Sequence, residues 1–176
     1  MATTLAKAFE AKVKEDWQKM ENAVIDRLYD PTAGFHGIAN ICDFIGYKYP
    51  FIAYLEVKTV KGNTFPFTNL TQYDALTTKI DTPGAIAGVI IWFYEKGQIL
   101  FAPIEEIEKM KDGGLKSVNC KDFIDDKYVD KYNLIKIPSI KKRTYYDSDY
   151  SVLITWAMNK YRKHWEELNG KYNILE

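Results

Sequence analysis

Three residues in the first third of the chain combine two carboxylates with a lysine at a spacing suited to chemistry on phosphate. Asp43 lies thirteen residues before Glu56, and Lys58 follows Glu56 by two. Neighbouring carboxylates repel each other unless a divalent cation binds them, and hard oxygen ligands suit Mg²⁺, with Mn²⁺ as a substitute. A lysine beside them can orient an attacking water or stabilise the charge that develops at phosphorus. The pattern therefore predicts metal-assisted hydrolysis of a phosphodiester bond.

The strand that carries Glu56 and Lys58 is predicted over Phe51–Val60. Side chains alternate between the two faces of a strand, so Glu56 and Lys58 point the same way. Taken alone, these two residues also fit an ordinary strand with a Glu–Lys pair on its solvent face. Asp43 makes that alternative less favourable, because the short joint Gly46–Pro50 predicts a hairpin that pairs its strand, Ile41–Tyr47, with the strand of Glu56.

The elements around this hairpin indicate an α/β protein. Ala85–Tyr94 is almost wholly apolar and rich in Val and Ile, which is typical of a central strand covered on both faces. Apolar residues at three- and four-residue steps predict helices at both ends of the chain. The further elements that we expect are strands at Ala23–Leu28, Gln98–Ala102 and Leu134–Ile137, helices at Thr3–Met20, Asn69–Ile80, Pro103–Lys111 and Ser151–Leu168, and a loop at Pro138–Asp149.

In this setting Asp43, Glu56 and Lys58 resemble the PD-(D/E)XK nuclease motif. Longer segments around them, residues 40–44, 55–59 and 63–70, resemble the RecU-type Holliday-junction resolvases and their phage-encoded relatives. The similarity covers roughly Phe9 to Phe101. The resemblance implies a restriction-endonuclease-like fold, a mixed β-sheet flanked by helices. It also implies an endonuclease that makes paired symmetric nicks in four-way DNA junctions, and a homodimer with two active sites.

The resemblance also implies roles for single residues. Asp43 and Glu56 correspond to the metal-binding carboxylates, the Val57 carbonyl to a further ligand, and Lys58 to the catalytic lysine. Hydrolysis by water attack in line with the leaving 3′ oxygen leaves 5′-phosphate ends.

Two helical residues are implied as further members of the site. Glu10 corresponds to a glutamate of the first helix that completes such sites, with Glu21 as a rival for the same place and a solvated surface charge as the plain alternative. Gln72 corresponds to a glutamine that holds phosphate or water, provided that the register shifts by a residue or two. An ordinary exposed glutamine is the alternative.

Two departures from the family pattern bear on specificity. RecU-type resolvases carry an extended stalk before the motif aspartate, whereas only residues 30–41 are available here, and Met1–Thr4 lacks the basic N-terminal arm. Nuclease chemistry is therefore better supported than junction specificity. The alternatives are another nuclease of this superfamily, acting on flaps, ends or duplex sites, and a non-catalytic nucleic-acid-binding protein of the same fold.

Basic residues outside the motif are candidates for DNA contact. Lys141, Lys142 and Arg143 form the densest basic run and precede Tyr145-Tyr146, a combination that suits phosphate contact and stacking on an unpaired base. Lys61 and Lys79 are candidates nearer the motif. For the basic run, a solvated loop is the alternative interpretation.

Composition narrows the class of protein. The chain has 176 residues, with 24 Lys plus Arg and 24 Asp plus Glu, and this neutrality argues against a protein that coats nucleic acid non-specifically. Two distant cysteines predict no disulfide framework. No signal peptide is evident, and the longest apolar run, residues 84–93, is far short of the roughly 20 residues that span a bilayer. We expect one nuclease domain over residues 1–176, without a membrane partner, in the cytoplasm (of the host cell if phage-encoded).

Overall fold

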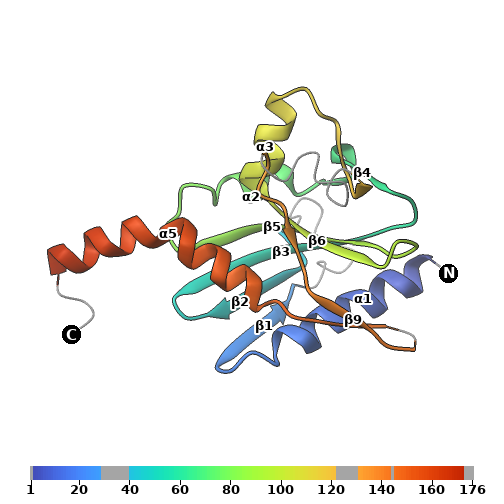
Figure 1. Cartoon of the computed structure of the whole chain (residues 1–176), viewed down its shortest axis with the longest axis horizontal. Helices are drawn as coiled ribbons and strands as arrows, with labels where there is room; N and C mark the ends of the chain where they lie inside the picture. The colour runs from blue at the N-terminus through green and yellow to red at the C-terminus, as the bar shows by residue number, and fades with distance from the viewer. Residues whose placement is uncertain (1, 29–39, 122–130, 144, 173–176) are drawn as a thin grey trace, which may run out of the picture.

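A six-stranded mixed sheet forms the centre of the molecule (Figure 1). The structure is a computed structural model that describes residues 2–28, 40–121, 131–143 and 145–172. The strand order is β1-β2-β3-β5-β6-β8; β3 and β5 are parallel, and the other neighbours are antiparallel. The strands are β1 (Ala23–Arg27), β2 (Phe44–Lys48), β3 (Phe51–Val60), β5 (Ala85–Phe93), β6 (Gln98–Pro103) and β8 (Ile135–Lys136).

Strand β3 is paired on both sides, and this position makes it the scaffold of the candidate site. Its register against β5 aligns Glu56 with Val89, and β5 is buried along its whole length. The expected hairpin of β2 with β3 is present, with Phe44 opposite Leu55. The prediction of a strand over Phe51–Val60 and of a covered central strand next to it is confirmed. Because β2 and β5 both pair with β3, the backbone of β3 is fixed and the side chains that it carries have defined positions.

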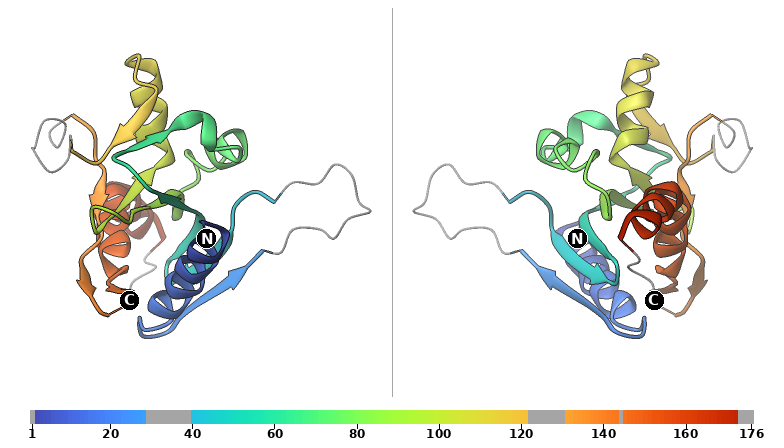
Figure 2. Two further views of the ribbon diagram at one scale, coloured as in Figure 1. Left: turned by 90° about the vertical axis from the view of Figure 1, so that its right-hand side faces the viewer. Right: turned by 90° about the vertical axis from the view of Figure 1, so that its left-hand side faces the viewer.

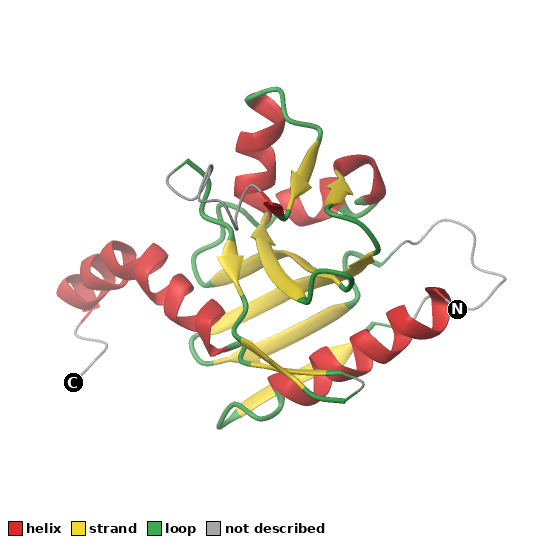
Figure 3. Ribbon diagram, turned by 45° about the vertical axis from the view of Figure 1, so that its right-hand side comes forward, coloured by secondary structure: helices red, strands yellow, loops and turns green. Residues whose placement is uncertain are grey.

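Helices cover both faces of the sheet (Figure 3). On one face, α1 (Ala2–Trp17) and α5 (Ser151–Tyr172) enclose an aromatic-rich core that includes Trp17 and Phe44. On the other face lie α2 (Tyr73–Thr77) and α3 (Ile104–Asp112), together with a small sheet of β4 (Thr64–Pro66) and β7 (Ser117–Asn119). The expected mixed sheet flanked by helices is thus observed. Among the described helices, none combines the length and the apolar character needed to cross a bilayer.

Two sequence-based expectations about local structure are wrong. Asn69–Ile80 is not one helix: a 3-10 turn, η1 (Phe67–Asn69), ends before Leu70, and the short α2 begins only at Tyr73. Buried Leu70 and Leu76 pack into the core from separate turns, and this packing outweighs the helical spacing.

The second error is at Pro138–Asp149, which contains a hairpin of β9 (Ser139–Lys141) with β10 (Tyr146–Ser148) rather than a loop. The hairpin was missed because its strands are short and it is held by contacts with distant elements. The remaining elements agree within a few residues at their ends. The short connection expected in place of a stalk, residues 30–41, lies largely outside the described residues.

Candidate active site

Asp43 lies immediately before β2 and is bound to the backbone on both sides of Glu56. The Asp43 N–H donates to the Leu55 carbonyl at 3.1 Å, and its carboxylate Oδ2 accepts the Val57 N–H at 2.8 Å. The Asp43 carbonyl in turn accepts the Leu28 N–H at 2.8 Å. The two backbone bonds extend the strand pairing by one residue, and β2 begins at Phe44 rather than at Ile41. The Val57 bond orients the carboxylate and leaves Oδ1 without a hydrogen bond to any described residue.

Glu56 is a buried acid that is only partly paired. Its side chain is 1% exposed; Oε1 lies 2.7 Å from Lys58 Nζ, and Oε2 has no hydrogen-bond partner among the described residues. Burial raises the pKa of Glu56 to about 7, and the nearby Asp43 charge adds to the shift, while Lys58 opposes it. An acid held in this way favours a proton or a cation as its partner, because burial of an uncompensated charge is costly.

Lys58 lies on the same face of β3 as Glu56, as the alternation predicted. Its side chain is partly exposed, and its ammonium group contacts the Glu56 carboxylate directly. The group therefore lies at the boundary between the buried acid and solvent. In that position a compact positive charge can reach a phosphate or a water as well as Glu56.

Glu10 of α1 lies close enough to these groups to interact with them electrostatically. It forms an ion pair with Arg27 of β1. The pKa of Glu10 is raised, mainly because the side chain is partly buried, and the nearby Asp43 charge adds to this shift. The positive charges of Arg27 and Lys58 oppose it. Glu21, the rival for this place, is exposed and precedes the end of β1 that pairs with Lys48, away from the Asp43 end. Glu10 rather than Glu21 therefore lies near Asp43 and Lys58, and its part in the site stays a prediction.

The remaining expected residues are spread over several parts of the surface. Gln72 directly precedes α2, and its Oε1 accepts the Thr71 hydroxyl at 2.8 Å; it makes no described contact with the carboxylates. Lys79 lies 5.4 Å from the ring of Tyr54, which is on the same face of β3 as Glu56. Lys61 is exposed just after β3. Lys141, Lys142 and Arg143 lie on the β9–β10 hairpin, outside the carboxylate cluster.

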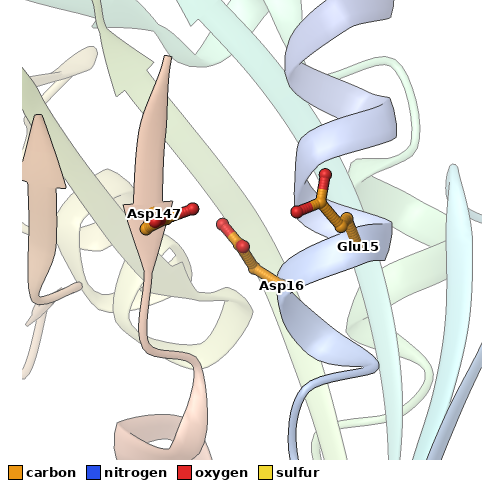
Figure 4. Close-up of side chains that lie close together, drawn as sticks. All are labelled: Glu15, Asp16 and Asp147. Carbon is orange, nitrogen blue, oxygen red and sulfur yellow. The ribbon is translucent and has the colours of Figure 1, made fainter. Parts of the chain in front are cut away.

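A second acidic group was missed by the sequence analysis. Figure 4 shows Glu15 and Asp16 of α1 facing Asp147 of β10. The ammonium groups of Lys12 and Lys19 lie among these carboxylates at 2.7–3.5 Å. Lysines already neutralise the carboxylates, so this group is a salt-bridge cluster. The Lys12–Asp16 spacing of four was readable in the helix, but the approach of Asp147 depends on tertiary structure.

The donor set of Asp43 and Glu56 fits a hard divalent cation. Asp43 Oδ1 and Glu56 Oε2 make no hydrogen bond with the part of the chain that the structure describes, and the two residues are tied together through the backbone of β3. Mg²⁺ keeps several waters and needs only one or two protein carboxylates. The Val57 N–H already binds Asp43, and its carbonyl as a ligand stays a prediction.

Comparison with known proteins identifies the family. The fold and the paired carboxylates define an α/β protein with an acidic site on a central strand. A family model described as Recombination protein U matches residues 7–160, and the chain therefore belongs to this family of Holliday-junction resolvases. The matched range contains every expected site residue.

Searches of solved structures and of curated proteins add little to the family assignment. The structure is similar to that of Hjc, a Holliday junction resolvase from the archaeal hyperthermophile Archaeoglobus fulgidus. The TM-score is 0.45 and the identity 19%, over 57% of this chain and 78% of the other. At this level the likeness carries no argument about the site. A search of curated proteins found no match.

Proposed function

We propose that this protein is a divalent-metal-dependent endonuclease that resolves four-way DNA junctions by paired symmetric nicks, with Mg²⁺ as its metal. Membership of a family of junction-resolving nucleases supports DNA cleavage in recombination and repair. The observation that carries metal dependence is the buried Glu56, whose Oε2 has no hydrogen-bond partner among the described residues, beside Asp43. Phage-type specificity and cytoplasmic location remain predictions.

The proposed roles follow from the contacts. Asp43 and Glu56 would hold the cation, which when bound supplies Lewis-acid stabilisation of the phosphoryl oxygens. Lys58 positions the attacking water or the phosphate, because its ammonium group is anchored by Glu56 and reaches solvent. Glu10, which forms an ion pair with Arg27, would add a third carboxylate to those of Asp43 and Glu56. Gln72, Lys61 and Lys79 are proposed only as phosphate contacts at its margin.

We further propose that the active form is a homodimer. Paired nicks in a junction with two-fold symmetry need two active sites in a matching arrangement. Isologous pairing of two copies is the commonest route to that symmetry.

The test compares cleavage of labelled four-way junctions, flaps and linear duplex with Mg²⁺ or EDTA. Asp43→Asn and Glu56→Gln should abolish cleavage but preserve or strengthen junction binding, because metal is lost while negative charge near phosphate falls. Lys58→Ala should lower the cleavage rate by about 10²-fold or more. The exposed residues of the β5–β6 turn supply matched controls, Glu95→Gln and Lys96→Ala, which should cut at the wild-type rate.

Each outcome has a definite meaning. Symmetric nicks confined to the junction support resolution, whereas equal cutting of every substrate indicates a general nuclease. Cleavage by Asp43→Asn or Glu56→Gln at the wild-type rate would show that the site is elsewhere. Tight binding without cleavage in Mg²⁺ or Mn²⁺ would contradict an enzymatic role.

A further inference from the structure

The β9–β10 hairpin presents a cluster of positive charge beside α1. Lys141 is the last residue of β9, and Lys142 and Arg143 follow it in the turn; all three are exposed. The Lys142 N–H donates to the Tyr145 carbonyl at 2.8 Å. Lys142 lies 3.5 Å from Asp147, and Lys141 and Arg143 make no ion pair with the residues that the structure describes. At least two cations of the hairpin therefore face solvent.

A buried carboxylate holds this hairpin on α1. Asp16 has a fully buried side chain; its Oδ1 accepts Lys12 Nζ at 2.8 Å and Lys19 Nζ at 2.7 Å. Its Oδ2 accepts the backbone N–H of Ser148, the last residue of β10, at 2.9 Å. A buried carboxylate is stable only when donors surround it, and one of these donors is the hairpin backbone itself.

Asp147 completes the attachment from the hairpin side. Its Oδ1 lies 2.7 Å from Lys12 Nζ and 3.2 Å from Lys19 Nζ, so each lysine bridges Asp16 and Asp147. Figure 4 shows the Asp16 and Asp147 side chains facing each other. We call Lys12, Asp16, Lys19 and Asp147 the hairpin anchor. Hairpins of two short strands are marginal by themselves, so contacts with the rest of the molecule must hold this one. The hairpin anchor supplies the ionic contacts, and Tyr146 packs on Trp92 with ring centroids 5.8 Å apart.

Helix α1 connects the hairpin to the candidate active site. Glu10 and Lys12 are two residues apart, which places them about 200° apart around the helix. Figure 2 shows the hairpin and strand β1 on either side of α1. A helix with its side chains is roughly 10–12 Å wide, and a duplex offers a phosphate about every 3.4 Å along each strand. A DNA arm that crosses α1 would therefore reach the hairpin within a few base pairs of the site.

We propose that the β9–β10 hairpin is a separate DNA-backbone contact, and that the hairpin anchor positions it relative to the active site. The proposal rests on the proposed DNA-cleaving function and extends it. Lys141, Lys142 and Arg143 bind phosphates of the arm next to the cut. Asp16 and Asp147, although negative, promote DNA binding because they hold these cations in place.

The first experiment measures the phosphate contacts directly. Binding of a four-way junction is titrated without metal in a Glu56→Gln background at several salt concentrations. Replacing Lys141, Lys142 and Arg143 together by Gln should weaken binding at least about tenfold and reduce the slope of log K against log [salt] by about 2–3. The matched control replaces three basic residues of α5 by Gln, Arg162, Lys163 and Lys171, and should change the slope by less than about 1.

The second experiment separates positioning from net charge. Asp147→Asn removes a negative charge near DNA, and charge alone predicts tighter binding. The anchor predicts the opposite, binding about three- to tenfold weaker, because the freed hairpin must be ordered on DNA. Trypsin cleavage after residues 141–143 should also become faster at temperatures where circular dichroism shows the protein folded. Asp147→Glu, which can restore the ion pairs, should recover part of both effects.

These outcomes separate the inference from the proposed function. An unchanged salt slope in the triple variant would overturn the DNA contact, even if the wild-type protein cuts junctions. Tighter binding by Asp147→Asn, or an unchanged rate of trypsin cleavage, would overturn the anchor. Failure of the Glu56→Gln protein with an intact hairpin to bind any junction would instead contradict the proposed function.

Discussion

The buried carboxylate of Glu56 lowers the stability of the folded protein, and the same carboxylate is suited to bind a cation. The carboxylate is buried beside Asp43, and Lys58 compensates it only in part. Polar groups in such surroundings are uncommon in a core that serves packing alone, and perturbed acids of this kind concentrate at functional sites. The same feature that would bind a cation therefore makes the metal-free protein sensitive to pH.

We predict that the metal-free protein loses stability as the pH rises from about 4.5 to about 7. The folded-state pKa of Glu56 is about 7, above its ordinary 4.5, so the folded state binds the proton more tightly and is favoured at the lower pH. Asp147, whose pKa is lowered to about 2, titrates below this window. The check is the unfolding temperature in EDTA from pH 5 to 8, with Glu56→Gln as the comparison.

Glu56→Gln should flatten this pH dependence because it removes the titrating carboxylate. Mg²⁺ should raise the unfolding temperature of the wild-type protein at pH 8 but leave that of Glu56→Gln nearly unchanged. Equal pH profiles for the two proteins would show that Glu56 is not the responsible group.

At the scale of elements, the site depends on how closely β5 packs between β3 and β6. Gly88 pairs with Leu55 of β3 and with Pro103 of β6. A Cβ added at Gly88 would lie 2.3 Å from the Ala102 carbonyl oxygen and 2.7 Å from the Phe101 ring. A backbone atom at that distance cannot move without disturbing the sheet, so this position requires glycine for close approach.

Gly88→Ala should lower the free energy of unfolding by about 1–3 kcal/mol, the usual cost of overpacking a core. Urea denaturation would measure this change. Gly62→Ala is the matched control, because a Cβ there meets no atom of the described residues within 4 Å, and it should be nearly neutral. An equally small effect at both glycines would mean that the sheet relaxes around the added methyl group.

For the whole molecule, a net charge of zero conceals local differences. The exposed hairpin cations lie beside α1, whereas Glu105 and Glu106 in the first turn of α3 are paired with Lys160 and Lys109. Neutrality therefore disfavours a protein that coats DNA, but it is compatible with binding through a limited surface. A limited surface on each copy also suits a dimer that presents two sites to one junction.

We predict that mixed dimers of wild-type and Asp43→Asn chains make single nicks. On a supercoiled plasmid with an extruded cruciform, wild-type dimers should give linear product and mixed dimers nicked circles, because one site of each mixed pair is inactive. Light scattering should give twice the chain mass of 20.4 kDa at working concentration. A monomer mass, or linear product from purified mixed dimers in a single turnover, would contradict the dimer.

Much of the candidate site was predictable because its pattern is local. The strand of Glu56 and Lys58 follows from alternation and β-branched composition, and a shared face follows from the two-residue period. The long apolar segment ending at Phe93 likewise indicates a central strand. These features depend on neighbours in sequence, and the structure reproduces them with shifts of a few residues at most.

Tertiary structure alone decided which distant groups meet. Glu10 rather than Glu21 lies near the carboxylates because α1 brings it to Arg27, the residue of β1 that pairs with Phe44 next to Asp43. Gln72 makes no described contact with them, and the helix expected to carry it is interrupted at Leu70. The attachment of the basic hairpin to α1 depends on Asp16 and the Ser148 N–H, separated by 132 residues. The sequence by itself determined residue types and local periodicity; long-range hydrogen bonds and ion pairs form only where folding brings two surfaces together.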